Sequence, residues 1–182
     1  PPFLIGSFAL LAGQPAGIRF PLLGVLCGLS LMVMLPAHPA WSCFETQRCV
    51  EVDVGADRLK IDRSTATQLE TLHKLAQKFA PDGRTFIAAP FWPGAYAALG
   101  RRSPMWESYA LFPRSEAFQR AEIERIKTAR PGFILINDGA LDGRDETRFL
   151  NTHPIIDRYI RDNFERLIRF SSDSTRVYRS RD

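Results

Sequence analysis

SEAFQRAEIERIKTARPGFILIND, residues 115–138, places a helix, a turn and a buried strand in immediate succession. Ser115 is of a residue type that caps helix N-termini, and residues 116–129 after it predict a helix. The Pro131-Gly132 dipeptide ends that helix. Residues 133–136, FILI, form a short run of apolar side chains, which is typical of a strand covered on both faces. A helix followed at once by such a strand indicates an α/β fold.

The same alternation continues on both sides of this stretch. Upstream, the patterns predict strands at 49–54, 59–61 and 85–89, and a helix from Ser64 or Thr65 to about Phe79. Downstream, Pro154 suits the first turn of a third helix. A hairpin of residues 167–170 and 175–178 then closes the domain. This order predicts a small parallel or mixed sheet flanked by helices.

Charge is distributed unevenly along the 182 residues. The net charge is +4, and 24% of the residues are charged, but Arg19 is the only ionised side chain between residues 1 and 41. Beyond residue 45, arginines are scattered among acidic residues and form no block of like charge. A nucleic-acid partner is therefore not expected, because such a partner requires a concentrated basic surface.

Residues 18–37, IRFPLLGVLCGLSLMVMLPA, carry no charge after Arg19. At about 1.5 Å per helical residue, a segment of this length covers most of a hydrocarbon core of roughly 30 Å. The pattern predicts a membrane-spanning helix, preceded by the end of an earlier span at residues 3–12 and a short loop. We therefore expect a membrane region at residues 1–41 and an extracytoplasmic α/β domain at residues 42–182, with the lipid bilayer as a partner.

Two other interpretations of this segment stay open. It has features of a signal peptide cleaved near Ala37 or Ala40, although the small-residue cleavage pattern is poor and apolar sequence precedes Arg19. It is also compatible with a buried core helix, although it lacks the polar stripe that such a helix usually shows. One arginine in a short loop favours the cytoplasmic side for that loop, and hence an extracytoplasmic location for everything beyond Trp41.

Cys43 and Cys49 follow the apolar segment and are six positions apart. An oxidising compartment would permit a disulfide between them, and the sequence leaves the bonded and the free states equally open. No histidine neighbours them at the spacing of zinc ligands, so no metal site is predicted there. Cys27 is interpreted as a packing residue within the apolar segment.

The first candidate binding region follows the predicted strand at 85–89 and reads PFWPGAYAALGRRSPMW, residues 90–106. Its aromatic side chains are suited to stacking on a sugar or resting at a lipid interface, and its arginine pair is suited to a phosphate. The competing interpretation is that the aromatic side chains cover the edge of the sheet while the arginines are solvated. The candidate binding residues are Trp92, Tyr96, Arg101, Arg102 and Trp106.

The second candidate region follows the strand at 133–136 and spans residues 137–153. Asp138, Asp142, Asp145 and His153 are of types that bind metals or transfer protons. Their spacing does not fit a calcium loop, however, and Asp-Gly dipeptides are ordinary turn sequences. His153 is equally suited to the start of the helix at Pro154. Asp138 and His153 are kept as candidate binding residues, with no catalytic residue and no metal site predicted.

Several stretches resemble the C-terminal end of bacterial polytopic glycosyltransferases of the GT-C class, which includes protein mannosyltransferase-like and aminoarabinose transferase-like enzymes. The resembling stretches are residues 86–104, 131–154, 155–167 and the terminal VYRSR. The resemblance implies sugar transfer from a polyprenyl-phosphate donor to an acceptor outside the cytoplasm. It implies an inner-membrane location with a periplasmic C-terminal domain, a lipid-linked sugar or a glycan acceptor as partner, and no cofactor in this fragment. The family's catalytic carboxylate lies in a loop near the N-terminus, so no catalytic residue carries over.

Other functions compete with this one. Dinucleotide-binding, P-loop, serine hydrolase and zinc protease motifs are absent from the sequence. Whether this fragment has enzymatic activity of its own is therefore uncertain, and we expect it not to be catalytic alone. The alternatives are a membrane-tethered binding or scaffolding domain without activity, and a secreted hydrolase.

Overall fold

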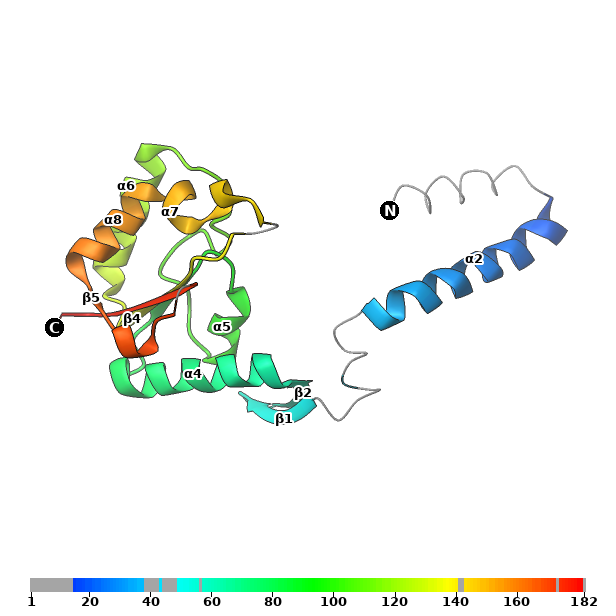
Figure 1. Ribbon diagram of the computed structural model, residues 1–182, viewed down its shortest axis with the longest axis horizontal. Coiled ribbons are helices and arrows are strands. Elements are labelled where there is room, and N and C mark those ends of the chain that lie inside the picture. Colours follow the sequence, from blue (N-terminus) through cyan, green and yellow to red (C-terminus); the bar gives the residue numbers. More distant parts are fainter. Residues whose placement is uncertain are drawn as a thin grey trace. The chain divides into compact units, whose positions relative to one another are not determined.

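Figure 1 shows the computed structural model of the chain, which describes residues 15–37, 43, 49–55, 57–140, 143–172 and 174–181. The chain divides into two compact units. The first comprises Pro1–Val52 and Leu59–Arg63, and the second comprises Asp53–Arg58 and Ser64–Asp182. The predicted earlier span at residues 3–12 and the predicted boundary between residues 41 and 42 lie outside the described residues.

The first unit contains the long apolar helix α2, Ala16–Ala37. Large apolar side chains along it are exposed, and their exposed fractions run from 42% at Leu22 to 75% at Met32. Within the described part of the chain, no helix combines the length and apolar character needed to cross a membrane. The membrane-spanning helix predicted at residues 18–37 is therefore not supported.

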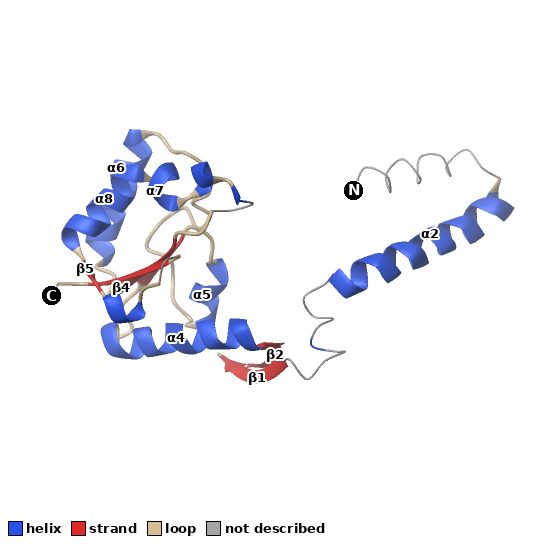
Figure 2. Ribbon diagram, in the orientation of Figure 1, coloured by secondary structure: helices blue, strands red, loops and turns tan. Residues whose placement is uncertain are grey.

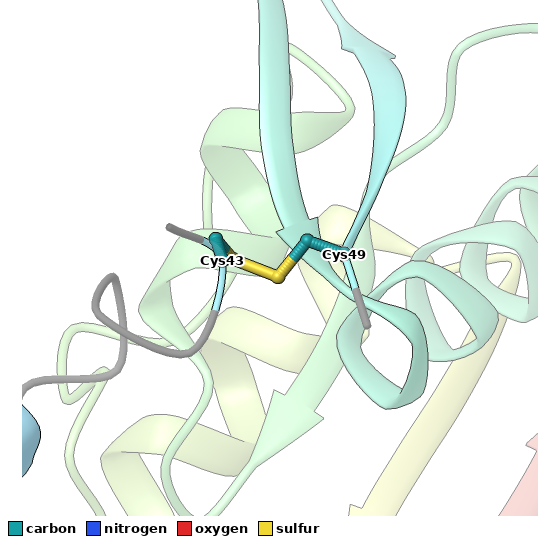
Figure 3. The surroundings of a disulfide bond; sticks show 2 residues. All are labelled: Cys43 and Cys49. Carbon is teal, nitrogen blue, oxygen red and sulfur yellow. A yellow bond between two sulfur atoms is a disulfide. The ribbon is translucent and has the colours of Figure 1, made fainter. Parts of the chain in front are cut away.

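A disulfide joins Cys43 to Cys49 (Figure 3). Cys49 is also the first residue of β1, Cys49–Val54, which pairs with β2, Asp57–Asp62, in a two-stranded sheet. Gly55, in the turn between these strands, has a φ of 63°, a conformation that glycine adopts without strain. The free cysteine Cys27 is exposed on α2.

The second unit is built on a four-stranded mixed sheet in the order β3-β4-β6-β5. β3, Phe86–Ala89, is parallel to β4, Phe133–Asn137, and β4 is antiparallel to β6, Thr175–Arg179. The two-residue β5, Glu165–Arg166, pairs with the far end of β6. The predicted small mixed sheet is therefore confirmed.

Helices flank this sheet on both faces (Figure 2). They are α4, Arg63–Phe79; α5, Pro93–Ala98; α6, Glu116–Ala129; α7, Phe149–Thr152; and α8, Pro154–Asn163. α6 begins as its sequence predicts, because the Ser115 side chain accepts a hydrogen bond from the Phe118 amide at 3.3 Å. The short helices α5 and α7 were not predicted, since both lie in stretches rich in loop residues.

Alternation along the strands creates two apolar layers. Ile87, Ile134 and Ile136 lie in one buried cluster with residues of α6 and α8. On the other face, the rings of Phe86 and Phe133 are stacked with their centroids 4.9 Å apart. α4 buries Leu69, Leu72, Leu75 and Ala76.

The closing hairpin differs from the predicted one. Residues 168–170 form a single 3₁₀ turn, η3, and the strand that pairs with β6 is the shorter segment just before it. Leu167 donates one hydrogen bond to the Val177 carbonyl at 2.8 Å, after which Phe170 bonds back to Leu167 at 3.1 Å. The backbone therefore satisfies its polar groups locally, so it leaves the sheet one turn earlier than its apolar pattern indicates.

Candidate functional site

A cavity of about 440 Å³ opens where β3 and β4 end. Open α/β sheets bind their ligands at the carboxyl ends of parallel strands, which is where this cavity lies. Its walls come from the first half of α4, the ends of β3 and β4, and the loop that leads into β6. The lining residues are Thr67, Gln68, Thr71, Ala89, Phe91, Trp92, Leu135, Asn137, Phe170, Ser172, Ser174 and Thr175.

Strand register and helix spacing bring these side chains together. Asn137 and Thr175 are direct partners in the antiparallel pairing of β4 with β6, so their side chains share one face of the sheet. Thr67 and Thr71 are four residues apart on α4 and therefore adjacent on its surface. Trp92 immediately precedes α5, and its carbonyl accepts a hydrogen bond from Ala95 at 3.1 Å. The cavity is thus built from regular, hydrogen-bonded elements.

Three hydrogen bonds fix the rim of the cavity. The Asn137 side-chain carbonyl accepts from the Gly139 amide at 3.2 Å. Ser172 Oγ accepts from the Thr175 amide at 3.1 Å, and the Ser174 carbonyl accepts from the Asp138 amide at 2.6 Å. The amide group of Asn137 is therefore held with its oxygen occupied and its nitrogen available.

Of the predicted aromatic residues, Trp92 alone lines this cavity. The Trp106 side chain is 72% exposed and meets the Phe118 ring edge-on, at a centroid distance of 6.3 Å. Tyr96 is buried, and its hydroxyl oxygen accepts a hydrogen bond from the Ala88 amide at 3.0 Å. Burial raises the pKa of the Tyr96 phenol above its ordinary value. The three aromatic residues therefore do not form one platform.

The two predicted arginines are also separated from the cavity lining. The Arg101 guanidinium donates to the Arg84 carbonyl at 2.7 Å and to the Ala80 carbonyl at 3.0 Å. It therefore ties the loop before β3 to the loop after α5. Arg102 is exposed, and its carbonyl accepts a hydrogen bond from the Thr85 hydroxyl.

Asp138 belongs to a buried ion cluster on the α8 side of the sheet. Its Oδ2 atom lies 3.0 Å from Arg176 Nη2, which also lies 2.7 Å from Asp157 Oδ1. Burial alone would lower the pKa of the Arg176 guanidinium, but the Asp157 carboxylate outweighs burial and the pKa is raised. This cluster joins β6 to α8.

The side chains of the second candidate region form no metal-binding group within the part of the chain that the structure describes. No group of three or more histidine, cysteine, aspartate or glutamate side chains there is placed to hold a metal ion. Asp145 is exposed and pairs with Arg148. Asp142 lies outside the described residues.

His153 is the N-cap residue of α8, but its side chain makes no capping hydrogen bond and lies in a buried polar network. Its Nε2 atom is 3.1 Å from Glu107 Oε2, and its Nδ1 atom is 2.9 Å from Thr152 Oγ1. An ionised carboxylate only accepts hydrogen bonds. Nε2 therefore carries the proton of the neutral ring and donates a hydrogen bond to Glu107. Nδ1 is then the acceptor, and the Thr152 hydroxyl donates to it. Glu107 also accepts from Arg114 Nη2 at 2.6 Å.

The order of hydroxyl, imidazole and carboxylate is that of a nucleophilic triad. Thr152 is only 1% exposed and His153 is 0% exposed, however, so a substrate has no path to the hydroxyl. The network therefore holds the loop containing Glu107 against α7 and α8. Sequence analysis missed Glu107 because it lies 46 positions from His153 and belongs to no motif.

This histidine makes stability depend on pH. Burial lowers the pKa of His153 from its ordinary value of 6.5, and the Glu107 carboxylate opposes that effect only in part. As the pH falls through 6.5, the unfolded chain binds a proton that the folded chain does not, so stability falls by up to about 1.4 kcal/mol per pH unit. Urea unfolding between pH 8 and pH 5 should show this slope, reduced in His153→Gln and retained in the control His73→Gln. Equal slopes of stability against pH in all three proteins would contradict the assignment of this pH dependence to His153.

Comparison of the chain with models of protein families, with curated proteins and with solved structures found no match. Function is therefore inferred from the chain's own residues. Among the described residues, the cavity at the ends of β3 and β4 is the concave feature that combines a sheet edge, aromatic side chains and available hydrogen-bonding groups.

Proposed function

We propose that this chain is the membrane-associated, acceptor-side part of a glycosyltransferase. The parent enzyme transfers a sugar from a polyprenyl-phosphate-linked donor to an acceptor outside the cytoplasm. This part does not carry the reactive centre but contributes contacts to the acceptor. The proposal rests on the resemblance to GT-C class enzymes and on one observation, the apolar surface of α2.

Beyond Arg19, the surface of α2 is apolar on every side. Val25, Leu31, Val33 and Met34 point in four different directions around the helix and are 58%, 59%, 72% and 48% exposed. A helix that is hydrophobic all round is stable when it is covered by protein or by lipid, because exposure of such a surface to water is unfavourable. We therefore propose that α2 inserts into a bilayer.

The disulfide supports the proposed location of the second unit. Disulfides persist in oxidising compartments, such as the bacterial periplasm, and are rare in the cytosol. The bond between Cys43 and Cys49 lies in the stretch that connects α2 to the α/β unit. A periplasmic α/β unit attached to the inner membrane agrees with this chemistry.

A membrane-tethered binding or scaffolding domain without enzymatic activity is the second candidate. It is favoured by the absence of an ionisable group among the described residues that line the cavity. The buried Thr152–His153–Glu107 network does not supply a catalytic group in its place, because solvent does not reach that network. Both candidates share membrane association and ligand binding, and they differ in whether the parent protein transfers sugar.

Membrane association is tested by flotation with phospholipid vesicles. Replacing Leu29 with aspartate should weaken binding of the chain to vesicles by at least about tenfold, because a carboxylate on the inserted apolar surface would lose its hydration without gaining a counter-charge. Ile168→Asp is the matched control, since Ile168 is 83% exposed on the second unit and should not alter flotation. If wild-type protein stays in the aqueous fraction, the proposed insertion of α2 is wrong.

Sugar transfer is tested with the natural full-length protein, tagged at its C-terminus and purified in detergent. Incubation with a radiolabelled polyprenyl-phosphate hexose and membrane extract should label an acceptor. A folded, membrane-associated protein that transfers no label would favour the scaffolding candidate.

A further inference from the structure

The cavity at the ends of β3 and β4 is free of charge in the part that the structure describes. None of its 12 described lining residues is ionisable, although 24% of the chain is charged. A phosphate or carboxylate ligand in such a cavity would lose its water without gaining a counter-charge, which is strongly unfavourable. The lining therefore selects an uncharged ligand.

Aromatic side chains form the apolar part of the cavity. Phe91 and Trp92 follow one another directly after β3. The Phe91 ring meets the Tyr109 ring edge-on at 4.7 Å, and an isolated β-bridge joins the same two residues. Phe170 contributes a third ring, which is packed edge-on against Phe79 at 6.2 Å. The Phe91 and Phe170 rings are therefore held in place by neighbours outside the cavity lining, so these two rings offer fixed surfaces to a ligand.

Amide and hydroxyl groups form the polar part. The Gln68 side chain and Asn137 Nδ2 have no hydrogen-bond partner among the described residues. Seven of the lining residues carry an uncharged polar side chain, and these groups both donate and accept hydrogen bonds. They are Thr67, Gln68, Thr71, Asn137, Ser172, Ser174 and Thr175.

This combination excludes two simpler ligands. A lipid chain would cover Gln68 and Asn137 without offering them a partner, at a cost of about 1–3 kcal/mol for each buried polar group. An amino acid or peptide terminus would bring an ionised group that the described lining does not neutralise. A sugar ring has apolar C–H faces that suit aromatic rings and hydroxyl groups that match amides.

We infer that the cavity binds an uncharged sugar, as a segment of a neutral glycan, with one ring stacked on Trp92 and its hydroxyls bonded to Gln68 and Asn137. A volume of about 440 Å³ lies within the range of small-molecule sites and accommodates one to two sugar rings. This inference rests on the proposed function and names the acceptor class for it. Because the described lining holds no cation, the phosphate of a lipid-linked donor is bound elsewhere.

The test is isothermal titration of the full chain in detergent with three neutral disaccharides, namely chitobiose, mannobiose and cellobiose. Glucose 6-phosphate and glucuronic acid serve as charged comparators. At least one disaccharide should bind, and the charged sugars should bind at least about tenfold more weakly. Binding of none of the neutral disaccharides, or tighter binding of a charged sugar, would overturn the inference.

Variants locate the site. Trp92→Ala should weaken binding of the disaccharide by about tenfold or more. Gln68→Ala and Asn137→Ala alter exposed side chains and should each weaken it severalfold while the protein stays folded. Trp106→Ala, which removes a ring outside the cavity, should bind as wild type does. Equal affinity in the Gln68, Asn137 and Trp106 variants would place the sugar elsewhere.

Failure of this inference differs from failure of the proposed function. Vesicle flotation and polyprenyl-phosphate sugar transfer do not depend on an occupied cavity. A chain that floats and whose parent enzyme transfers sugar, yet binds no neutral disaccharide, would retain the proposed function and lose this site. A chain that binds a neutral disaccharide without supporting transfer would retain the site and favour the scaffolding candidate.

Discussion

Replacement of Gly132 by alanine is expected to destabilise the α/β unit by roughly 2–4 kcal/mol and to lower its melting temperature by about 10 °C. A Cβ atom at this position would lie 2.3 Å from the Phe79 carbonyl oxygen and 2.8 Å from the Ala80 Cβ. The first of these contacts is with backbone at the end of α4, so no side-chain rotation relieves it. The strand start and the helix end would have to separate.

Thermal unfolding followed by circular dichroism measures this effect. Gly94→Ala is the matched control, because a Cβ there meets nothing within 4 Å and the residue lies in α5. That substitution should be neutral or stabilising by up to about 1 kcal/mol, since alanine favours helix. A Gly132→Ala protein with the stability of wild type would show that β4 and α4 are not packed as described.

Gly132 shows what the sequence predicts and what it leaves out. The Pro131-Gly132 dipeptide predicts the end of α6, and the structure places the end of that helix at Ala129. Nothing in the local sequence indicates that this glycine touches α4, because the contact joins Gly132 to Phe79, 53 positions away. Local patterns determine where elements begin and end, whereas contacts between elements depend on the folded chain.

The candidate site follows the same rule. Trp92 was predicted because it follows a strand and is of a type that binds sugars. Gln68 was not predicted as a site residue. The sequence of α4 has the pattern of an ordinary amphipathic helix, and nothing in that pattern indicates that its polar face borders a cavity. The prediction for His153 was incomplete for a related reason. The position next to Pro154 indicates a helix start, but the ring turns inward to a carboxylate far away in the sequence.

Replacement of Glu107 by alanine is expected to destabilise the α/β unit by about 2–4 kcal/mol. The Glu107 side chain is 5% exposed and accepts hydrogen bonds from Arg114 and His153. Without it, the Arg114 guanidinium still reaches water because it is 40% exposed. The Nε2–H group of His153 cannot reach water, since that residue is 0% exposed. The unpaired N–H group of the imidazole and the cavity left by the carboxylate together account for the loss of stability.

A double-mutant cycle isolates the imidazole–carboxylate contribution. His153→Phe removes the donor to Glu107 but keeps a ring that can stack on Phe149, whose centroid lies 5.2 Å from that of His153. If the buried hydrogen bond is made, urea unfolding of the two single variants and the double variant should give a coupling of about 1–2 kcal/mol. Glu116→Ala is the control for loss of a glutamate, because Glu116 pairs with Arg120 on the exposed face of α6 and should change stability by less than about 0.5 kcal/mol. Additive effects of the Glu107 and His153 substitutions would mean that the hydrogen bond between the two side chains adds no stability.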